Sequence, residues 1–449
     1  MTTVGDLLVD YDGCLAVPTP APSVPRTGRL LSGRLPAAGL ALGSVAAVEG
    51  AANRLCEAVG LEPRPVTLQP ERVAASFSGD RMLRVGGAPV AGFAELSGFF
   101  RTGDGWVRTH ANYPHHRARL LAALGLPDDA DREALERNLA ARPSEEIETL
   151  ATEAGAIAVR VRDENEWRES APGRAAYDAP LIDVRRRQDA AVVPEGRDVP
   201  TADRPLAGVR VLDLTRVIAG PVATRTLALL GAEVLRLDPA HLPEIAAQHY
   251  DTGHGKRTAR LDLRDPAGLV TFEQLLDEAD VLVCGYRPGS LPERLGLEAS
   301  ARRPGLIRAQ VSAWPLHGPW AHRRGFDSIV QATSGIALIE GDEHRPGALP
   351  AQVLDHASGY LLAAAVVDAF TTRLRRGPGC DVAVSLAGTA SWLLASPHRQ
   401  DGPPPAELPS PGTTTTTHGR VTTARPALSG YPDYPAPARE WGTDEARWA

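Results

Sequence analysis

Three apolar segments between Pro205 and Gly296 alternate with helical sequence, and this alternation constrains the fold more than any other feature. The segments are residues 209–215, 233–238 and 280–284, and Ala219-Gly220-Pro221 opens an Ala/Leu-rich helix between the first two. Strands joined through helices build a parallel sheet, and the carboxyl ends of its strands form a crevice that binds ligands. The spacing predicts an α/β fold with an open, parallel, Rossmann-like sheet that holds a nucleotide-like ligand.

The sequence outside this sheet divides into segments of different composition. Residues 1–75 are rich in Ala, Gly and Pro, and residues 76–188 alternate short strand and helix patterns typical of a smaller α/β domain. A Pro-containing linker over 189–204 leads to the sheet domain over 205–395. Residues 396–449, with a five-threonine run, predict an extended tail.

The composition excludes several classes of function. A net charge of -7 over 449 residues gives no sign of a nucleic-acid or membrane-surface partner. The four cysteines lack C-x-x-C spacing, which indicates reduced thiols and no zinc site. No secretory signal is visible, and apolar runs such as 360–370 are too short to span a bilayer. We therefore expect a soluble cytoplasmic protein without a metal centre.

Basic residues fall at or just past the predicted strand ends. Arginine forks and an ammonium suit phosphate groups, although any one of these residues alone is more simply a solvated surface charge. The sequence holds one lysine, and the group comprises Arg236, Lys256, Arg257, Arg264 and Arg294. Because the Gly-x-Gly-x-x-Gly loop is missing from the first strand–helix turn, a dinucleotide oxidoreductase is disfavoured.

Asp355 lies between a short apolar strand and an apolar helix predicted over 360–374. It is either an N-cap that accepts the first-turn N–H groups or a carboxylate that attacks a carbonyl carbon at the sheet edge. Spacing alone favours the cap. Asp327 is likewise expected to be a cap, and His356 is expected to be structural.

At these residues the chain resembles the family III CoA-transferases, the CaiB/BaiF group, to which the α-methylacyl-CoA racemases are related. The resemblance covers about residues 205–386. Its ordered motifs are residues 205–213, 219–221, 231–234, 256–257, 279–283, 286–289, 325–327, Asp355 with Gly359, and 377–382.

The resemblance implies transfer of coenzyme A between an acyl-CoA and a carboxylic acid through an aspartyl anhydride and an aspartyl thioester. Asp355 would be the nucleophile, coenzyme A would be a substrate rather than a permanently bound cofactor, and the protein would be a homodimer. By position, the family's CoA contacts fall on Val217, Lys256, Leu261, Arg264, Gly285, Tyr286 and Arg294.

Several departures from the family pattern leave alternatives open. Phe326 stands where racemase relatives carry a histidine base, so a racemase would need another base such as His322 or His356. The family's Gly-Asp-x-x-Arg motif is missing, and Gly86-Gly87 is the nearest match to its glycine-rich loop. The small domain precedes the sheet domain, as if the parts were rearranged or partly duplicated. A CoA-binding protein that has lost catalysis is therefore the main alternative.

Overall fold

A seven-stranded sheet forms the centre of the protein in a computed structural model that describes residues 3–189, 198–288 and 304–449. Six neighbouring strands run parallel and one edge strand, β6, pairs antiparallel with β12. The predicted α/β fold with an open, mostly parallel sheet is confirmed. The strand order is β6 (Asp183–Arg186), β12 (Cys380–Ser385), β11 (Ile307–Ser312), β10 (Val281–Cys284), β7 (Arg210–Leu214), β8 (Glu233–Asp238) and β9 (Arg257–Arg260).

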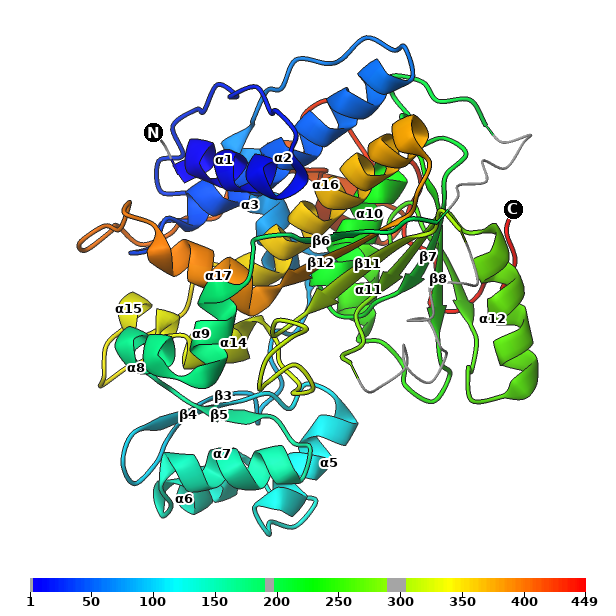
Figure 1. Cartoon of the computed structure of the whole chain (residues 1–449). Helices are drawn as coiled ribbons and strands as arrows, with labels where there is room; N and C mark the ends of the chain where they lie inside the picture. Colours follow the sequence, from blue (N-terminus) through cyan, green and yellow to red (C-terminus); the bar gives the residue numbers. More distant parts are fainter. Residues whose placement is uncertain (1–2, 190–197, 289–303) are drawn as a thin grey trace.

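The long helix α16 (Val353–Arg376) packs between the sheet and the N-terminal helix α2 (Ala37–Ala58) (Figure 1). Alanine makes up much of α2, and α10 (Ala219–Leu229) covers another side of α16. By length and composition α16 could cross a membrane, yet its apolar window is entirely buried inside the protein, as in a core helix. It begins before the predicted residue 360, so Asp355 lies within its first turn.

Outside the smaller unit described next, eleven further helices lie in the described part of the chain, and some of them pack on the sheet while others lie toward the bottom of the view (Figure 1). They are α1 (Thr3–Leu15), α3 (Pro70–Phe77), α4 (Gly79–Met82), α8 (Glu164–Glu169), α9 (Ala171–Asp178), α11 (Ala246–Thr252), α12 (Pro266–Glu278), α14 (Asp327–Thr333), α15 (Ile336–Glu340), α17 (Leu386–Ala395) and α18 (Pro411–Thr414).

A smaller α/β unit, cyan at the bottom of Figure 1, holds its own apolar core. Its sheet has the order β3 (Gly98–Arg101), β4 (Trp106–Thr109), β5 (Ala158–Arg160), and its helices are α5 (Pro114–Ala123), α6 (Arg132–Ala140) and α7 (Ser144–Glu153). Leucines and Ile147 on one face of these helices pack against Phe100 and Val107 of the sheet. The Asp131 carboxylate begins α6 by accepting the Ala134 N–H at 2.8 Å.

The tail packs on the rest of the protein through strand pairing. Strands β13 (Thr415–His418) and β14 (Val421–Ala424) join β1 (Arg84–Val85) and β2 (Ala88–Pro89) in a second antiparallel sheet. The last residues run along β9, where Asp444 N donates to the Thr258 carbonyl at 2.9 Å and Trp448 is buried.

Candidate active site

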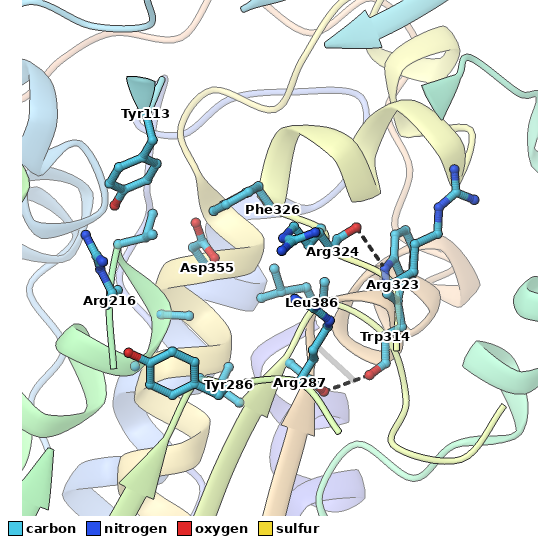
Figure 2. Close-up of a pocket in the computed structure, with 18 of the residues that line it drawn as sticks. Tyr113, Arg216, Tyr286, Arg287, Trp314, Arg323, Arg324, Phe326, Asp355 and Leu386 are labelled. Atoms are coloured by element: carbon cyan, nitrogen blue, oxygen red, sulfur yellow. Dashed lines mark hydrogen bonds between the residues drawn. The ribbon is translucent and has the colours of Figure 1, made fainter. Parts of the chain in front are cut away.

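A cavity of about 290 Å³ lies at the carboxyl ends of β7 and β10, which pair side by side in the sheet. This is the edge at which open parallel sheets bind ligands. Its walls come from the segments that follow these strands, from residues 311–326, from the small unit and from the first turn of α16. Figure 2 labels the main lining side chains, which are Tyr113, Arg216, Tyr286, Arg287, Trp314, Arg323, Arg324, Phe326, Asp355 and Leu386.

The Asp355 carboxyl faces this cavity, between Tyr113 and Arg216 on one side and Phe326 on the other (Figure 2). The residue is 6% exposed, and among the described residues its side chain makes no hydrogen bond. Asp327 supplies the helix cap instead, because its Oδ2 accepts the Asp355 N–H at 3.0 Å. The interpretation of Asp355 as an N-cap is therefore wrong, and its carboxyl is available for chemistry.

Asp355 and Asp327 form a buried pair of acids. Burial raises the pKa of Asp355 well above its ordinary value, and the charge of Asp327 raises it further. Burial also raises the pKa of Asp327 to about 6, against the hydrogen bonds that it accepts from the Asp355 backbone and the Gln331 amide. Two carboxyl groups in such surroundings resist ionising together. Once ionised, Asp355 is a more basic carboxylate than an exposed aspartate.

Arginine side chains give the cavity a positive potential. Arg324 donates to the Gly155 carbonyl at 3.1 Å, and burial with the charges of Arg287 and Arg119 lowers its pKa to about 10. Because like charges repel here, an anion placed among them would be stabilised. Arg216 and Arg323 also line the cavity and have carboxylate partners in Glu244 and Glu148.

The turn from β7 into α10 positions the wall beside Asp355. Val217 adopts a left-handed φ of +72°, which costs a β-branched residue about 1–3 kcal/mol, and its N–H donates to Glu244 Oε2 at 3.1 Å. Gly359 lets α16 approach α10, because a Cβ there would lie 2.5 Å from the Ala219 carbonyl oxygen. This contact brings the first turn of α16 against the strained turn.

A second cavity, of about 90 Å³, shares part of this wall. Val217, Phe326 and Asp355 line both cavities and so form the partition between them. The other walls of the smaller cavity come from residues 80–93, from His110 and Asn112, from α11 and from His356. Gly86-Gly87 form the turn between β1 and β2, and residues 90–93, which follow it, are the ones that line the cavity.

Comparison with known proteins identifies the sheet region. Residues 206–423 match the sequence model of CoA-transferase family III. The chain therefore carries a CoA-transferase family III region. It is 32% identical to an acyl-CoA transferase of Gibberella moniliformis over 294 residues, which are 61% of this chain and 51% of that protein. It is 34% identical to succinyl-CoA:glutarate CoA-transferase of Mus musculus over 194 residues, 39% of this chain and 44% of that protein.

Among solved structures, a CaiB/BaiF family protein from Brucella suis matches with a TM-score of 0.40 and 27% identity, over 43% of this chain and 56% of that one. The chain spans about half the length of the curated relatives it matches. The family match covers residues 206–423 and does not include the small unit that precedes them. A rearranged or duplicated order of domains therefore stays a prediction.

Three of the residues to which the family resemblance assigns CoA contacts line the large cavity with Asp355, namely Val217, Gly285 and Tyr286. Leu261 belongs to the same apolar cluster as Tyr286, after the end of β9. Arg264 is exposed at that edge, and its guanidinium pairs with Asp262 at 2.6 Å. Arg294 lies outside the described residues. The CoA contacts themselves stay predictions.

The ammonium of Lys256 lies in the interior and does not line the cavity. Its Nζ lies 3.1 Å from Asp213 Oδ2 and donates to the Pro221 carbonyl at 2.9 Å and to Thr224 Oγ1 at 2.6 Å. Burial lowers the pKa of Lys256 to about 8. With three partners inside the protein, this charge does not face a bound anion as the sequence pattern suggested.

Two of the predicted phosphate-facing arginines are likewise engaged within the protein. Arg236 is buried with Asp238 at 2.7 Å and Glu244 at 2.8 Å. Arg257 is half-buried and lies 3.4 Å from Glu233. The positive wall of the cavity comes instead from residues that the sequence did not single out. Of these, Arg216 and Arg287 follow β7 and β10, so the strand-end rule could have found them.

The small unit also contributes residues that sequence reasoning missed. Tyr113, His115 and His116 line the large cavity, and the His110 ring stacks on Phe326 with centroids 3.8 Å apart. No motif spacing marks these residues, because the contact depends on how the two units pack.

The alternative racemase bases occupy different places. His356 lines the smaller cavity, and burial lowers its pKa to about 3, which makes it a weak base. His322 is absent from the lining of both cavities, and its Nδ1 lies 3.0 Å from the Pro288 carbonyl oxygen.

Proposed function

We propose that this protein transfers coenzyme A between an acyl-CoA and a carboxylic acid, with Asp355 as the nucleophile. The observation that carries the proposal is the Asp355 carboxyl, which makes no hydrogen bond with any described residue and lies between two cavities, one of them lined by arginines. The match to CoA-transferase family III supports this reaction class. The name of the mouse relative, a succinyl-CoA:glutarate CoA-transferase, supports it as well.

The reaction begins with the ionised carboxylate, since the protonated acid is not a nucleophile. A carboxylate oxygen of Asp355 adds to the carbonyl carbon of the acyl-CoA thioester. The C–S bond then breaks, its electron pair stays on sulfur, and coenzyme A leaves as the thiolate. The product on the protein is a mixed anhydride between Asp355 and the acyl group.

The thiolate next attacks the Asp355 carbonyl carbon of this anhydride. The C–O bond to the acyl group breaks, so that the first acid leaves as its carboxylate and an aspartyl-CoA thioester remains. An acceptor carboxylate repeats both steps in reverse order, which gives the new acyl-CoA and restores the Asp355 carboxylate. The steps exchange nucleophiles only, so no oxidant, reductant or net proton is needed.

The surroundings of Asp355 suit two demands of this chemistry. The raised pKa makes its carboxylate a stronger nucleophile than an exposed aspartate. Arg216 and Arg324 line the same cavity, where their charges would hold an acceptor carboxylate or the anionic arm of coenzyme A beside the reacting carbon.

Covalent trapping tests the proposal. Incubation with an acyl-CoA and hydroxylamine, followed by peptide mass spectrometry, is expected to give a hydroxamate at Asp355. The Asp355→Asn protein serves as the control and should stay unmodified. Acyl exchange by a protein whose Asp355 remains unmodified would overturn the proposal. Binding of coenzyme A without any exchange would support the non-catalytic alternative.

A further inference from the structure

Positive charge outweighs negative charge in the lining of the large cavity. Four of the described residues that line it are arginines, and one, Asp355, is an acid. Two of the arginines have an acid partner that is not part of the lining: Arg216 lies 3.5 Å from Glu244, and Arg323 lies 3.0 Å from Glu148. The remaining positive charge of the cavity comes from its other two arginines.

One of these, Arg324, is a half-buried cation for which the described residues supply no acid. Its guanidinium donates to the Gly155 carbonyl at 3.1 Å and makes no other hydrogen bond among them. The Trp314 indole N–H donates to the Arg324 carbonyl at 3.4 Å, which fixes the backbone at this point of the wall. Because a guanidinium carries several N–H donors, Arg324 keeps donors for an anion.

Two further arginines act on Arg324. Burial, together with the charges of Arg287 and Arg119, lowers the pKa of Arg324 to about 10, so the group still carries its charge at neutral pH. Arg119 is exposed on α5 of the small unit and makes no hydrogen bond or ion pair with the described residues. We call Arg119, Arg287 and Arg324 the arginine cluster. Like charges gathered from three segments repel one another, and a bound anion removes this cost.

The arginine cluster acts at a distance from the nucleophile. In Figure 2, Arg216 and Arg324 lie on opposite sides of Asp355, with Phe326 on the Arg324 side. Burial and the charge of Asp327 raise the pKa of Asp355, and none of the described arginines opposes this shift. The Asp355 carboxylate thus keeps its basicity, and an anion held at the cluster is not the group that reacts with Asp355.

A carboxylate remote from the reacting carbon suits this place better than a phosphate of coenzyme A. Asp355 and Arg324 line one cavity, so a short chain can join the reacting carbonyl to the cluster. The phosphates of coenzyme A are separated from the thioester by the whole pantetheine arm, which would have to fold back to bring them here. Trp314, Leu386 and Val311 line the same cavity and offer apolar contacts to the methylene groups of a short chain.

On the basis of the proposed CoA transfer, we propose that the arginine cluster binds the second carboxylate of a dicarboxylic substrate, as the free acid or as its CoA thioester. The Arg324 guanidinium pairs with this carboxylate, and Arg119 and Arg287 add favourable charge. The other carboxyl group of the same molecule then lies at Asp355, where coenzyme A is exchanged. Arg324 and Arg119 are therefore specificity-determining residues.

Matched pairs of acceptor acids test the cluster, with acetyl-CoA as the donor. Succinate, glutarate and adipate are compared with butyrate, pentanoate and hexanoate, in which a methyl group replaces the second carboxylate. The unmodified protein is expected to favour the best dicarboxylate over its matched monocarboxylate by about tenfold or more in kcat/KM. Equal rates within all of the pairs would contradict the proposal.

Calorimetry on the Asp355→Asn protein measures the same preference without chemistry. Glutaryl-CoA is expected to bind about tenfold more tightly than pentanoyl-CoA. In this background Arg324→Met should weaken glutaryl-CoA about tenfold and acetyl-CoA much less. If acetyl-CoA is weakened by the same factor, Arg324 binds a phosphate of coenzyme A and the proposal is wrong.

Variants of the transferring protein locate the selection. Arg324→Met removes the guanidinium but keeps an unbranched stem, and it should reduce the dicarboxylate preference about tenfold, whereas Arg324→Lys should retain part of it. Arg119→Ser changes an exposed residue and should reduce the preference about threefold. Arg323→Met is the matched control, because Arg323 lines the same cavity but pairs with Glu148. It should leave the preference unchanged, and thermal melts check that all variants fold.

The two proposals fail in different ways. Equal affinity of the Asp355→Asn protein for glutaryl-CoA and pentanoyl-CoA overturns the carboxylate site, even if transfer proceeds. An equal loss of preference in Arg323→Met and Arg324→Met overturns it too, because the effect would then come from the general charge of the cavity. Tighter binding of glutaryl-CoA without any transfer by the unmodified protein refutes the CoA-transferase proposal and supports the site.

Discussion

Two buried acids near the carboxyl ends of the parallel strands, Asp213 and Asp355, have opposite surroundings. Asp213 is 0% exposed, and it receives Lys256 Nζ at 3.1 Å, Thr224 Oγ1 at 2.6 Å and the Thr215 N–H at 2.9 Å. Asp355 is almost as buried, but it faces another acid and a cavity. A buried charge with full partners stabilises a fold, whereas one without partners is typical of a site of chemistry.

This contrast predicts opposite outcomes for substitutions at the two acids. At Asp355, Asp355→Asn is expected to reduce CoA transfer at least about a thousandfold, because no other described carboxylate can form the anhydride at the partition. The free energy of unfolding should stay the same or rise, since an unfavourably placed acid is removed. Exchange assays and urea unfolding measure both quantities. Retained activity, or a large loss of stability, would mean that Asp355 is a structural acid like Asp213 and does not act as the nucleophile.

At the other acid, Lys256→Met is expected to lower the free energy of unfolding by about 3–5 kcal/mol, because it leaves Asp213 charged and buried without its cation. The double variant Lys256→Met/Asp213→Asn is the matched control and should recover part of this loss. Urea unfolding measures the difference. The CoA contact that the family resemblance assigns to Lys256 predicts another result, which is normal stability with a raised KM for acyl-CoA.

The pH dependence of transfer separates the two acids of the Asp355 pair. Transfer requires ionised Asp355, whose pKa is raised, so activity should be lost as pH falls through that raised value. Asp327→Asn removes the neighbouring charge and keeps an oxygen for the helix cap, so the acid limb of the pH–rate profile should move to lower pH. An unmoved limb would mean that Asp327 does not act on Asp355.

The same pair also affects stability. Because the folded protein keeps a proton on Asp355 that the unfolded chain releases above about pH 4, the free energy of unfolding should fall as pH rises from there through the raised pKa. In Asp327→Asn protein this fall should be smaller. Urea unfolding at a series of pH values measures this fall. The Asp355→Asn protein is the control, because it has no carboxyl at residue 355 to titrate.

The sequence predicted the sheet well, because apolar periodicity and turn residues are local signals. The strand predicted over 233–238 is β8, and the strand predicted over 280–284 contains β10. The sequence also identified Asp355 as a candidate for catalysis. The interpretation that Asp355 itself caps α16 was wrong. The acid that caps α16 comes from residue 327, and no local pattern shows that it bonds a helix 28 residues away.

The charges of the site were harder to predict, because ion pairing depends on contacts between distant segments. The sequence pattern predicted that Lys256 binds phosphate. In the structure its ammonium instead contacts Asp213 and Thr224. The small-unit side chains Tyr113 and His116 reach the cavity only through the packing of two units. A pattern of residue types thus identifies which side chains carry charge, while the partners of those charges decide which are available to a ligand.

The smallest expected effect concerns Arg264. This surface arginine pairs with an acid and is also exposed to solvent, so the contrast between paired and available charges is weakest there. Its side chain is 57% exposed and bonds Asp262, yet the family resemblance assigns it to coenzyme A. Arg264→Gln is expected to raise KM for acyl-CoA about threefold with kcat unchanged, because a phosphate contact stabilises ground and transition states alike. The increase should fade in high salt.

Arg137→Gln is the matched control for this substitution, since Arg137 also pairs with a nearby acid, Glu133, on an exposed surface far along the chain. Neither variant should change the free energy of unfolding measurably, because exposed pairs contribute little. If Arg264→Gln gives the same KM as Arg137→Gln, the ion pair of Arg264 with Asp262 is a surface pair without a role in binding coenzyme A. A salt-dependent difference between them would instead extend the CoA-binding surface from the Asp355 cavity to the far edge of the sheet.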